Sequence, residues 1–382
     1  MDTKPTKVVH MTSVHWAMDN RIFYKECRSL AKAGFQVTVV GPHTEDTVEE
    51  GVRIKSIPLE HSRLLRMTRT VWRVYREAKK QQADIYHFHD PELILAALLL
   101  RASGKDVIYD IHEDVPKDIM SKAYLPVWSR KMIAWMAETV EGLVSKYFSA
   151  LVTVTPSIAK RFQALNQKTI MVCNYPFQKE IAPAHEASPW DERRPSVAYV
   201  GLISKQRGIR EMVEALDLLP KSMEMTLELA GNEIPEEIDL QELKQLPGWS
   251  RVKHHGLLDR STTLRLLRGV RAGLVLFHPV PNSLESMPQK IFEYMGAGLP
   301  VIASDFPLWR QIMGGAGCGI FVDPLNPREI ARAIEYIVSN PAEAEEMGRR
   351  AQAAMIQQYD WNGQAEKLVE LYTGLSRSTC AA

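Results

Sequence analysis

Residues 282–304 read NSLESMPQKIFEYMGAGLPVIAS, and this stretch decides the interpretation of the fold. It follows the apolar run 272–277, which is typical of a buried strand, and it opens into a helical pattern. A glycine-containing turn ends that pattern, and the apolar run 300–303 predicts the next strand. Strands that alternate with helices in this way predict a parallel sheet covered by helices on both faces.

The same alternation fills both halves of the chain. In the N-terminal half we predict strands at 37–40, 83–88, 106–111 and 151–155. In the C-terminal half we predict strands at 197–200, 225–230, 252–255, 272–277, 300–303 and 319–322. We therefore expect two doubly wound, Rossmann-like α/β domains in tandem. Ligands of such sheets bind outside the carboxyl ends of the strands, so candidate site residues are those that follow strands.

A polar, proline-rich stretch interrupts the alternation once, and this is typical of a linker between domains. We predict an N-terminal Rossmann-like domain over residues 1–175, a linker over 176–194 and a C-terminal Rossmann-like domain over 195–360. A helix and tail over 361–382 complete the chain, and we expect this helix to cross back to the N-terminal domain.

The composition is that of a globular protein. The chain has 382 residues, of which 45 % are hydrophobic and 24 % charged, and its formal net charge is +1. Such a charge gives no global attraction to nucleic acid. The four cysteines have no spacing that suits zinc, which indicates a reducing, cytoplasmic setting. They are Cys27, Cys173, Cys318 and Cys380.

Glu285 and Glu293 lie on either side of the predicted helix start, the first in the preceding loop and the second inside the helix. Backbone N–H groups at such a start favour a bound anion such as a diphosphate, and Ser286 and Met287 lie there. Lys290 adds a positive charge at the same place. Glu293 can accept hydrogen bonds from two adjacent ribose hydroxyls. The alternative is a capped amphipathic helix with solvated charges.

The run from Glu285 to Ser304 resembles the hallmark of the group-one, GT-B-fold retaining glycosyltransferases. That hallmark is two glutamates separated by seven residues, followed by a run similar to EYMAxGxPVIAS. The resemblance implies two Rossmann-like domains that face each other across a cleft, with a nucleotide-sugar held by the second. It implies that Glu285 faces the hydroxyls of the donor sugar and that Glu293 holds the ribose. The N–H groups of Ser286 and Met287 would meet the sugar or the diphosphate.

The segment 199–210 is a second signal, because a glycine-rich turn between a strand and a helix lets backbone approach a phosphate. The family usually carries an arginine directly after the first glycine and a lysine before the second. Arg207 takes the place of that lysine, whereas Leu202 replaces the arginine. We infer that Lys205 or Lys290 supplies the missing charge. The alternative is an exposed basic loop.

Other strand ends of the C-terminal half are expected to approach the nucleobase and the phosphates, mainly through backbone groups. These donor-binding candidates are Gly201, Gly231, Asn232, His255, Gly256 and Leu257.

Two histidine segments follow strands of the N-terminal half. The resemblance places His112 near the donor sugar, where it would donate a hydrogen bond to a hydroxyl or act at the reacting centre. His87 and His89 are expected to point to opposite faces of their strand, and His89 could line the cleft. A structural role is the alternative for His112 and for His89. A His-x-His metal site is the least favoured interpretation.

The loop after the first strand carries Asp19, Asn20 and Arg21, where many members of the family have two glycines. These residues are candidates for contacts with the acceptor, and Arg21 is also a candidate for the donor phosphate.

We expect neither a cofactor nor a divalent metal, because no Asp-x-Asp pair follows a strand. Enzymes of this fold stabilise the leaving diphosphate with basic side chains and helix termini. The resemblance implies retention of the anomeric configuration by front-face substitution, in which the leaving phosphate assists deprotonation. The expected catalytic residues are His112, Glu285, Arg207 and Lys290.

Basic amphipathic stretches at 63–80 and 124–147 suggest a membrane surface or a lipid-linked acceptor. A packed helix with a solvated basic face explains them equally well. The longest apolar run, 93–100, is about half the ~20 residues that span a membrane, and residues 1–7 are unlike a signal peptide. We therefore expect a cytoplasmic protein that could lie peripherally on the inner face of the plasma membrane.

The sequence thus predicts a hexosyltransferase in polysaccharide or glycoconjugate synthesis. Its expected donor is a nucleotide-sugar, for which UDP is favoured over GDP, and its expected acceptor is a glycan or a lipid-linked molecule. A nucleotide-sugar epimerase of the same fold is one alternative. A catalytically degenerate sugar-nucleotide-binding protein is another, for which Leu202 gives slight support. A dinucleotide oxidoreductase is disfavoured because no GxGxxG follows the first strand, and no motif for nucleic acid accompanies the basic stretches.

Overall fold

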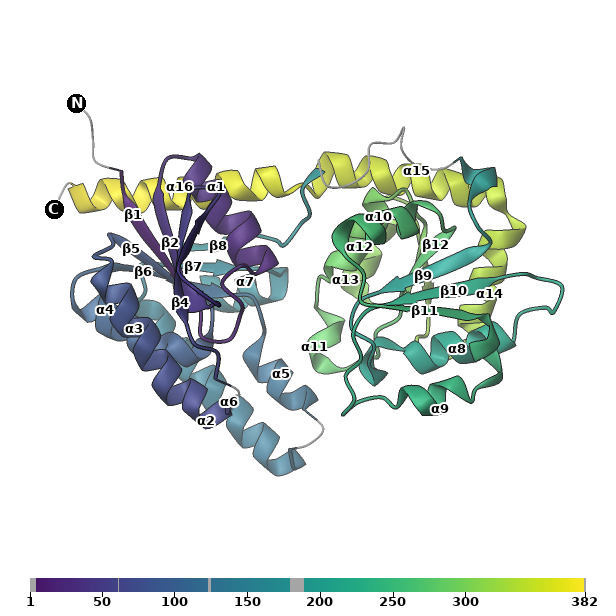
Figure 1. Ribbon diagram of the computed structural model, residues 1–382, viewed down its shortest axis with the longest axis horizontal. Helices are drawn as coiled ribbons and strands as arrows, with labels where there is room; N and C mark the ends of the chain where they lie inside the picture. Colours follow the sequence, from purple (N-terminus) through teal and green to yellow (C-terminus); the bar gives the residue numbers. More distant parts are fainter. Residues whose placement is uncertain (1–4, 61, 123–124, 179–188, 381–382) are drawn as a thin grey trace. The chain divides into compact units, whose positions relative to one another are not determined.

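The computed structural model describes residues 5–60, 62–122, 125–178 and 189–380. Residues 378–380 are described by their backbone alone. Figure 1 shows two compact units, each built around one sheet. Unit 1 comprises Met1–Asn174 with Trp361–Ala382, and unit 2 comprises Tyr175–Asp360. The predicted α/β fold with two sheets of Rossmann type is confirmed. Residues 179–188, within the predicted linker, lie outside the described residues.

The unit 1 sheet has eight strands in the order β3-β4-β2-β1-β5-β6-β7-β8, and only the β3–β4 pairing is antiparallel. The strands are β1 (Lys7–Met11), β2 (Gln36–Pro42), β3 (Thr47–Glu49), β4 (Val52–Ile57), β5 (Ile85–Phe88), β6 (Asp106–Ile111), β7 (Ala150–Thr153) and β8 (Thr169–Met171). The order reverses between β1 and β5, which are direct neighbours.

The helices of unit 1 follow the strands as in a doubly wound fold. They are η1 (Asn20–Cys27), α1 (Arg28–Lys32), α2 (Arg63–Leu65), η2 (Arg66–Thr70), α3 (Val71–Lys80), η3 (Pro91–Leu93), α4 (Ile94–Ala102), α5 (Val115–Ser121), α6 (Val127–Val144), η4 (Ser145–Tyr147) and α7 (Pro156–Gln163). The core is built from the alternating apolar residues of the strands, such as Val9, Tyr86 and Tyr109, packed against α3 and α4.

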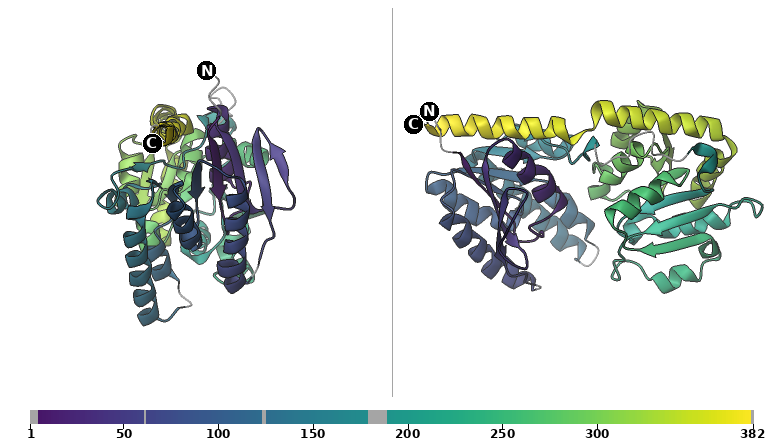
Figure 2. Two further views of the ribbon diagram at one scale, coloured as in Figure 1. Left: turned by 90° about the vertical axis from the view of Figure 1, so that its left-hand side faces the viewer. Right: turned by 45° about the horizontal axis from the view of Figure 1, so that its top comes forward.

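The C-terminal helix α16 (Trp361–Cys380) belongs to unit 1, as the sequence predicts. Figures 1 and 2 show it lying alongside η1 and α1. The fully buried indole of Trp361 donates to the Ser29 hydroxyl at 3.0 Å, and the fully buried Tyr372 contacts the sheet. The last helix therefore completes the N-terminal domain.

The unit 2 sheet has six parallel strands in the order β11-β10-β9-β12-β13-β14. The strands are β9 (Ser196–Val200), β10 (Thr226–Ala230), β11 (Val252–Gly256), β12 (Ala272–Val275), β13 (Val301–Ser304) and β14 (Gly319–Val322). The helices are η7 (Trp190–Glu192), η8 (Lys205–Arg207), α8 (Ile209–Asp217), α9 (Leu240–Lys244), η9 (Pro247–Arg251), α10 (Arg260–Arg268), α11 (Pro281–Leu284), α12 (Gln289–Gly296), α13 (Pro307–Trp309), η10 (Arg310–Gly314), α14 (Pro327–Ser339) and α15 (Pro341–Gln358).

Two segments bear on membranes. The basic stretch 63–80 forms α2, η2 and α3, and the stretch 124–147 forms α6 and η4, apart from residue 124, which lies outside the described residues. Within the described parts of the chain, each helix is too short or too polar to cross a bilayer.

Candidate functional site

The strand order of unit 2 reverses between β9 and β12, which are direct neighbours. An open parallel sheet binds its ligands at the carboxyl ends of the strands at such a reversal. Here the segments that leave this edge are the turn from Gly201 to Gly208 and the residues that follow β12. The predicted donor site therefore falls at the position that the topology favours.

Arg207 and Lys290 come together at this edge over one aromatic ring. The guanidinium carbon of Arg207 lies 3.8 Å from the centroid of the Phe277 ring, and Lys290 Nζ lies 5.0 Å from the same centroid. Lys290 Nζ also lies 4.8 Å from the ring centroid of Tyr199 and 3.5 Å from its hydroxyl. The sequence predicted the two cations, but it gave no indication that Phe277 and Tyr199 lie beneath them.

The two cations are held close to each other without an acidic partner. Burial, together with the charge of Arg207, lowers the pKa of Lys290 to about 7, although Glu293 acts in the opposite direction. Burial also lowers the pKa of Arg207. Among the described residues, neither side chain forms an ion pair with a carboxylate. The site is thus short of negative charge, which an anionic ligand would supply.

Two glycines let the lysine reach the end of β9. Gly201 has φ +141°, and a Cβ there would lie 2.7 Å from Lys290 Nζ. Gly231 has the same φ, and a Cβ there would lie 1.8 Å from the carbonyl oxygen of Gly201. Because any side chain at these positions would displace the lysine or the turn, both glycines serve the geometry of the site.

The loop before α12 differs in part from the expectation. Glu285 ends α11 and is exposed. The Ser286 N–H, predicted to meet the sugar or the diphosphate, donates to the Ser283 carbonyl at 3.2 Å, and the Ser286 carbonyl accepts from the Trp309 indole at 2.8 Å. Ser286 therefore shapes the loop with its backbone, because α11 ends in a turn that uses this N–H. Met287 is half-buried beside it.

Glu293 lies in α12, as predicted, and has a cationic partner that the sequence did not reveal. Its Oε1 lies 2.5 Å from Nη1 of Arg260, at the start of α10. The Glu293 side chain is 17 % exposed, so its carboxylate is still reachable. A ribose at this carboxylate would lie beside a guanidinium that is already in place.

The end of β11 supplies backbone more than side chains. His255 Nε2 lies 2.6 Å from Oε2 of the fully buried Glu228, so this imidazole is hydrogen-bonded to a buried carboxyl group. The Gly256 carbonyl accepts from the Gly231 N–H at 2.8 Å. Asn232 and Leu257 are exposed at the same edge. The predicted use of backbone groups fits this arrangement, whereas the His255 side chain is occupied.

In unit 1, the expectation that Arg21 contacts a phosphate is wrong. Its guanidinium is buried and donates to both carboxylate oxygens of Asp110 at 2.9 and 3.0 Å and to the Val172 carbonyl at 3.1 Å. Glu26 lies 3.0 Å from its Nε. The reason is local: Asp19 caps η1 and accepts the Arg21 N–H, so the residues predicted as a loop begin a helix instead.

That helix also fixes the other two acceptor-side candidates. The Asp19 carboxylate is used as the cap, at 2.7 Å from the Arg21 nitrogen and 3.1 Å from the Ile22 nitrogen. Asn20 is exposed in the first turn. The positive charge at this strand end comes instead from His15, which the sequence pattern did not indicate. Burial alone would lower the pKa of His15, but the hydrogen bond that its Nδ1 donates to the Asp90 carboxylate, together with the charge of Asp90, raises this pKa to about 9.

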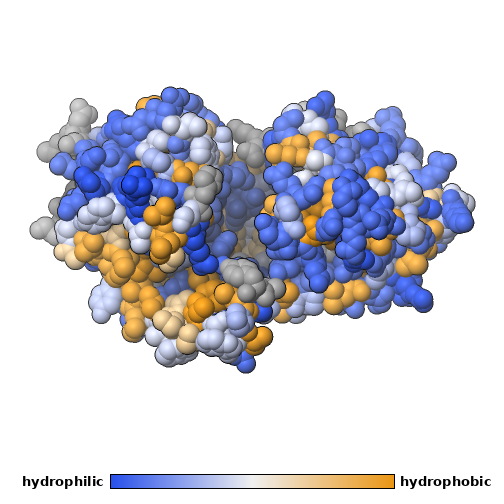
Figure 3. Space-filling model, turned by 60° about the horizontal axis from the view of Figure 1, so that its bottom comes forward, coloured by the Kyte–Doolittle hydropathy of each residue, from blue (hydrophilic) through white to orange (hydrophobic). Residues whose placement is uncertain are grey.

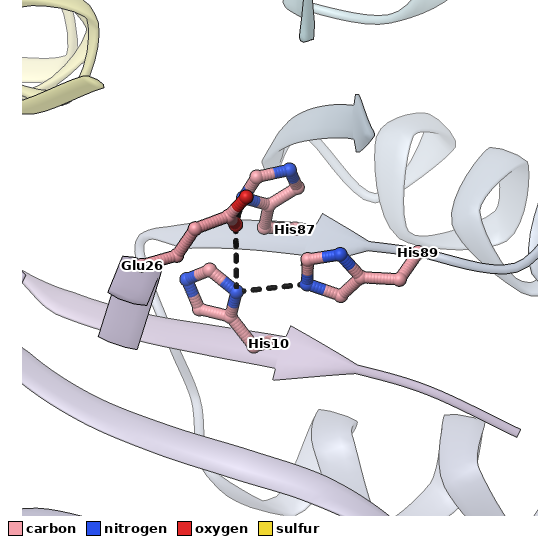
Figure 4. Close-up of side chains that lie close together, drawn as sticks. All are labelled: His10, Glu26, His87 and His89. Carbon is pink, nitrogen blue, oxygen red and sulfur yellow. Dashed lines mark hydrogen bonds and ion pairs between the residues drawn. The ribbon is translucent and has the colours of Figure 1, made fainter. Parts of the chain in front are cut away.

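A cluster of three histidines and one glutamate lies inside unit 1 (Figure 4). His87 and His89 stack with ring centroids 4.7 Å apart, so the expectation that they point to opposite faces is wrong. Side chains alternate along a strand, and residues two apart therefore share a face. His10 of the neighbouring strand β1 and Glu26 of η1 complete the cluster, and all four side chains are buried.

The nitrogens of this cluster form one chain of hydrogen bonds. His87 Nδ1 lies 2.7 Å from the Tyr372 hydroxyl, which lies 3.2 Å from His10 Nε2. His10 Nδ1 lies 2.9 Å from His89 Nε2, and His89 Nδ1 lies 3.0 Å from Asp110. Neutral imidazoles with a proton on each Nδ1 satisfy every link, because each ring then donates at Nδ1, and His10 and His89 accept at Nε2. Burial lowers the pKa of all three histidines, which favours these neutral forms.

A metal ion is a second interpretation of this cluster, because one ligand atom from each of the four residues lies within 4.8 Å of the others. The hydrogen-bond chain, however, already uses the nitrogens that face one another, and Arg21 stands 3.0 Å from Glu26. A cation would have to displace these hydrogen bonds beside a guanidinium. We therefore interpret the cluster as a structural network that joins α16 to the ends of β1 and β5.

The network predicts the effect of removing one hydroxyl. Tyr372→Phe leaves a buried His87 donor and a buried His10 acceptor without partners, so we expect the local opening free energy of α16 to fall by about 1–3 kcal/mol. Native-state hydrogen exchange of α16 measures this. Tyr336→Phe is the control, because the Tyr336 hydroxyl bonds Glu343 at the surface, and its effect should stay within about 0.5 kcal/mol. Equal effects of both variants would contradict the network.

His112 lies directly after β6, as predicted, and lines a pocket of about 660 Å³ in unit 1. Its side chain is 16 % exposed, and its Nδ1 lies 3.8 Å from Asp110 Oδ2. No hydrogen bond satisfies this nitrogen within the described residues. His15 and His89 line the same pocket, with a ring-centroid distance of 5.0 Å between His15 and His112. The carboxyl ends of β1, β5 and β6 thus place three imidazoles at one site.

Two family models together match most of the chain. Residues 20–174 match the model described as "Glycosyltransferase Family 4", and residues 180–354 match "Glycosyl transferases group 1". The chain belongs to the group 1 glycosyltransferases. The two matches divide this glycosyltransferase almost where its two units divide.

Curated relatives are distant. This glycosyltransferase is 23 % identical over 195 residues to glycogen synthase from Mycobacterium tuberculosis, a match that covers 50 % of this chain and 46 % of the relative. The chain therefore spans about half the length of that relative. It is also 23 % identical over 336 residues to a phosphatidyl-myo-inositol mannosyltransferase from Mycobacterium leprae, which covers 85 % of this chain and 80 % of the relative.

Solved structures confirm that the glycosyltransferase has the GT-B fold. Sucrose-phosphate synthase from Thermosynechococcus elongatus superposes with a TM-score of 0.77 at 18 % identity, over 98 % of this chain and all of that chain. HepE from Anabaena, in complex with UDP-glucose, superposes with a TM-score of 0.73 at 14 % identity, over 96 % of this chain and 99 % of that chain. WaaG, a glycosyltransferase involved in lipopolysaccharide biosynthesis, gives 0.73 at 16 % identity over 96 % and 100 %.

Proposed function

We propose that this glycosyltransferase transfers a hexose from a nucleotide-sugar whose diphosphate is bound at the β9–β12 edge of unit 2. A UDP-linked sugar is the preferred candidate for this donor, and a GDP-linked sugar is the second. One observation carries the proposal: Arg207 and Lys290 lie together over Phe277 with no carboxylate partner among the described residues. A diphosphate would neutralise both. The structures of HepE with UDP and with UDP-glucose support a donor of this class.

Each donor-site residue has a role in this proposal. Arg207 and Lys290 stabilise the charge that develops on the leaving diphosphate, where fixed cations lower the barrier without a divalent metal or other cofactor. Glu285 binds the sugar hydroxyls, and Glu293, held by Arg260, binds the ribose. Backbone groups of the strand ends read the base and the phosphates. Gly201, Gly231, Asn232, Gly256 and Leu257 carry these groups.

The reaction is proposed to retain the anomeric configuration by front-face substitution. The leaving phosphate oxygen, close to Lys290, would take the proton of the acceptor hydroxyl. His112 would donate a hydrogen bond at the reacting centre, because its unsatisfied Nδ1 belongs to an imidazole that lines a pocket. The transfer would serve polysaccharide or glycoconjugate synthesis.

The acceptor is proposed to be a glycan or a lipid-linked molecule, reached from a cytoplasmic position at the inner face of the plasma membrane. The stretches 63–80 and 125–147 support a peripheral contact, since they combine basic residues with exposed tryptophans. Trp72 is 54 % exposed and Trp128 is 71 % exposed. Basic helices with exposed Trp and Leu bind anionic bilayer surfaces.

A panel of UDP-, GDP- and dTDP-linked sugars tests the donor proposal by thermal shift. A ligand that binds only the folded protein raises its stability by mass action, so one nucleotide series should raise the Tm. Glu293→Ala should weaken that shift by removing the ribose contact. Asp323→Ala, an exposed carboxylate at the end of β14, is the control and should leave the shift unchanged. If no nucleotide-sugar series raises the Tm, the donor proposal is contradicted and only the assignment of the fold remains.

Lys290 predicts the pH dependence of donor binding. Because burial lowers its pKa to about 7, half of the free protein carries an uncharged lysine at pH 7, and a bound diphosphate raises this pKa. Donor affinity therefore falls as the pH rises through 7, and we expect the Kd of a nucleotide-sugar to be about tenfold weaker at pH 8 than at pH 6. Isothermal titration calorimetry measures both the Kd and the proton uptake.

Lys290→Arg is the control for this pH dependence, because an arginine stays charged at both pH values. Its Kd should change little between pH 6 and pH 8. A wild-type Kd that is the same at both pH values would show that Lys290 does not exchange a proton when the donor binds.

A further inference from the structure

The pocket of unit 1 that His112 lines is mostly apolar along its walls. Its volume of about 660 Å³ falls within the ~300–1,000 Å³ of small-molecule sites. The walls come from η2, α4, α5 and α6. Their apolar side chains are Met67, Ile94, Ile119, Ile133, Met136 and Val140. A sugar or a nucleotide alone has no long apolar part that could pack against these walls.

The floor of the pocket is polar. His89, Asp110 and His112 lie there at the ends of β5 and β6, and His15 brings a charged imidazole, since its pKa is raised to about 9 by Asp90. The pocket therefore has hydrogen-bonding groups at the strand ends, where the transfer is proposed to occur, and a mostly apolar passage between the helices, which Arg66, Asp118 and Lys122 also line.

The apolar surface continues outside the pocket. On α6, side chains that do not line the pocket are also exposed: Val127, Trp128, Met132, Trp135 and Leu143. Leu64 and Leu65 of α2 add to them. Figure 3 shows hydrophobic surface gathered over the helices of unit 1. An exposed apolar area of this extent marks a binding surface, and its continuity with the pocket indicates an occupant whose apolar part is longer than the pocket.

We infer that this pocket binds the hydrocarbon chain of an amphiphilic acceptor and holds its polar, hydroxyl-bearing head at His112. The inference rests on the proposed function and narrows its acceptor to molecules that carry a long apolar chain beside the head. Such a chain occurs both in prenyl lipids and in acyl lipids. The chain follows the passage lined by Ile133, Met136 and Val140 and leaves over the exposed face of α6.

Calorimetric titration of the full-length protein with n-alkyl β-glucosides, from butyl to nonyl and below their micelle concentrations, tests this inference. Each added methylene should strengthen binding about fourfold until the pocket is full. Met136→Glu should weaken nonyl glucoside binding at least tenfold and flatten the dependence on chain length. Val140→Glu, a second lining position at 47 % exposure, should act in the same direction.

Leu99→Glu is the matched control. Leu99 lies on α4 and is 51 % exposed against 52 % for Met136, but it neither lines the pocket nor belongs to the exposed face of α6. It should leave the dependence on chain length unchanged. If affinity does not depend on chain length in the wild type, or if Leu99→Glu and Met136→Glu lower it equally, the occupant does not enter the pocket and the inference is overturned.

Two further measurements distinguish a prenyl chain from an acyl chain, and failure of the pocket proposal from failure of the proposed function. Nonyl phosphate and geranyl phosphate compare a straight chain with a prenyl chain on one head, and tighter binding of either supports the pocket and names the source. The thermal shift by nucleotide-sugars, repeated on Met136→Glu, should equal that of the wild type. A wild type without any nucleotide response but with chain-length-dependent binding would overturn the proposed function and leave the pocket standing.

Discussion

Lys290→Met is expected to lower kcat/KM for the donor by about 10²–10³-fold. The lysine is a fixed cation at the position proposed for the leaving diphosphate, and removing one preorganised charge-stabilising group from an active site typically costs this much. Methionine has a similar length and is apolar, so it can occupy the space between the Tyr199 and Phe277 rings. Because a partly desolvated charge is removed, the stability of the fold should not fall. Steady-state kinetics of nucleoside diphosphate release measure the effect.

Lys205→Met is the control for this variant. The sequence left Lys205 and Lys290 as equal candidates for the charge that Leu202 does not supply. Lys205 is exposed in η8, whereas Lys290 lies over Phe277, so kcat/KM of Lys205→Met should stay close to that of the wild type. An equal loss of kcat/KM in Lys205→Met and Lys290→Met would contradict the assignment of this charge to Lys290.

His112→Asn is expected to lower kcat by about 10²-fold or more while nucleotide binding stays unchanged. Groups that hydrogen-bond or exchange a proton at a reacting centre contribute about 10²–10⁴-fold, and the asparagine removes the imidazole from the pocket floor. Nucleotide affinity should be unaffected because Arg207 and Lys290, the residues proposed to bind the diphosphate, belong to unit 2. A kinetic assay and a nucleotide thermal shift on the same preparation measure the two quantities.

His43→Asn is the control for His112. His43 is a histidine of the same unit that does not line the pocket, and its Nδ1 bonds the Glu45 carbonyl. This variant should keep the wild-type kcat. If His112→Asn also keeps it, then His112 does not act on the reaction and its position after β6 is structural.

The sequence predicted the features that depend on short-range pattern. Most strands and their order of appearance follow from apolar runs, although β3, β4 and β8 were not predicted. The string from Glu285 to Ser304 placed Lys290 and Glu293 on one helix, α12. The carboxyl ends of parallel strands then bring Arg207 to the same edge, although more than 80 residues separate it from Lys290 along the chain. Such positions follow from topology alone.

The features that the sequence missed depend on contacts between distant residues. Nothing local indicates that Arg260 would lie beside Glu293, or that Phe277 would lie beneath Arg207. The same holds for Tyr372, which reaches His10 from the last helix.

Arg21 was misjudged for a local reason. Asp19 is a strong helix cap, and a cap starts the helix at Asn20, which turns the arginine toward Asp110 in the interior. The substitution of the two glycines by polar residues therefore indicates an earlier helix start more than a new ligand. His15, four residues before this cap and half-buried, carries the charge at this strand end instead.

The central claim is that Arg207 and Lys290 form a diphosphate site. Calorimetric titration of the wild type with the nucleoside diphosphate of the responding series, and with the same nucleoside without phosphates, tests it most directly. We predict that the diphosphate binds at least about 100-fold more tightly and that this difference largely disappears in Lys290→Met. Equal affinities for diphosphate and nucleoside in the wild type would contradict the claim.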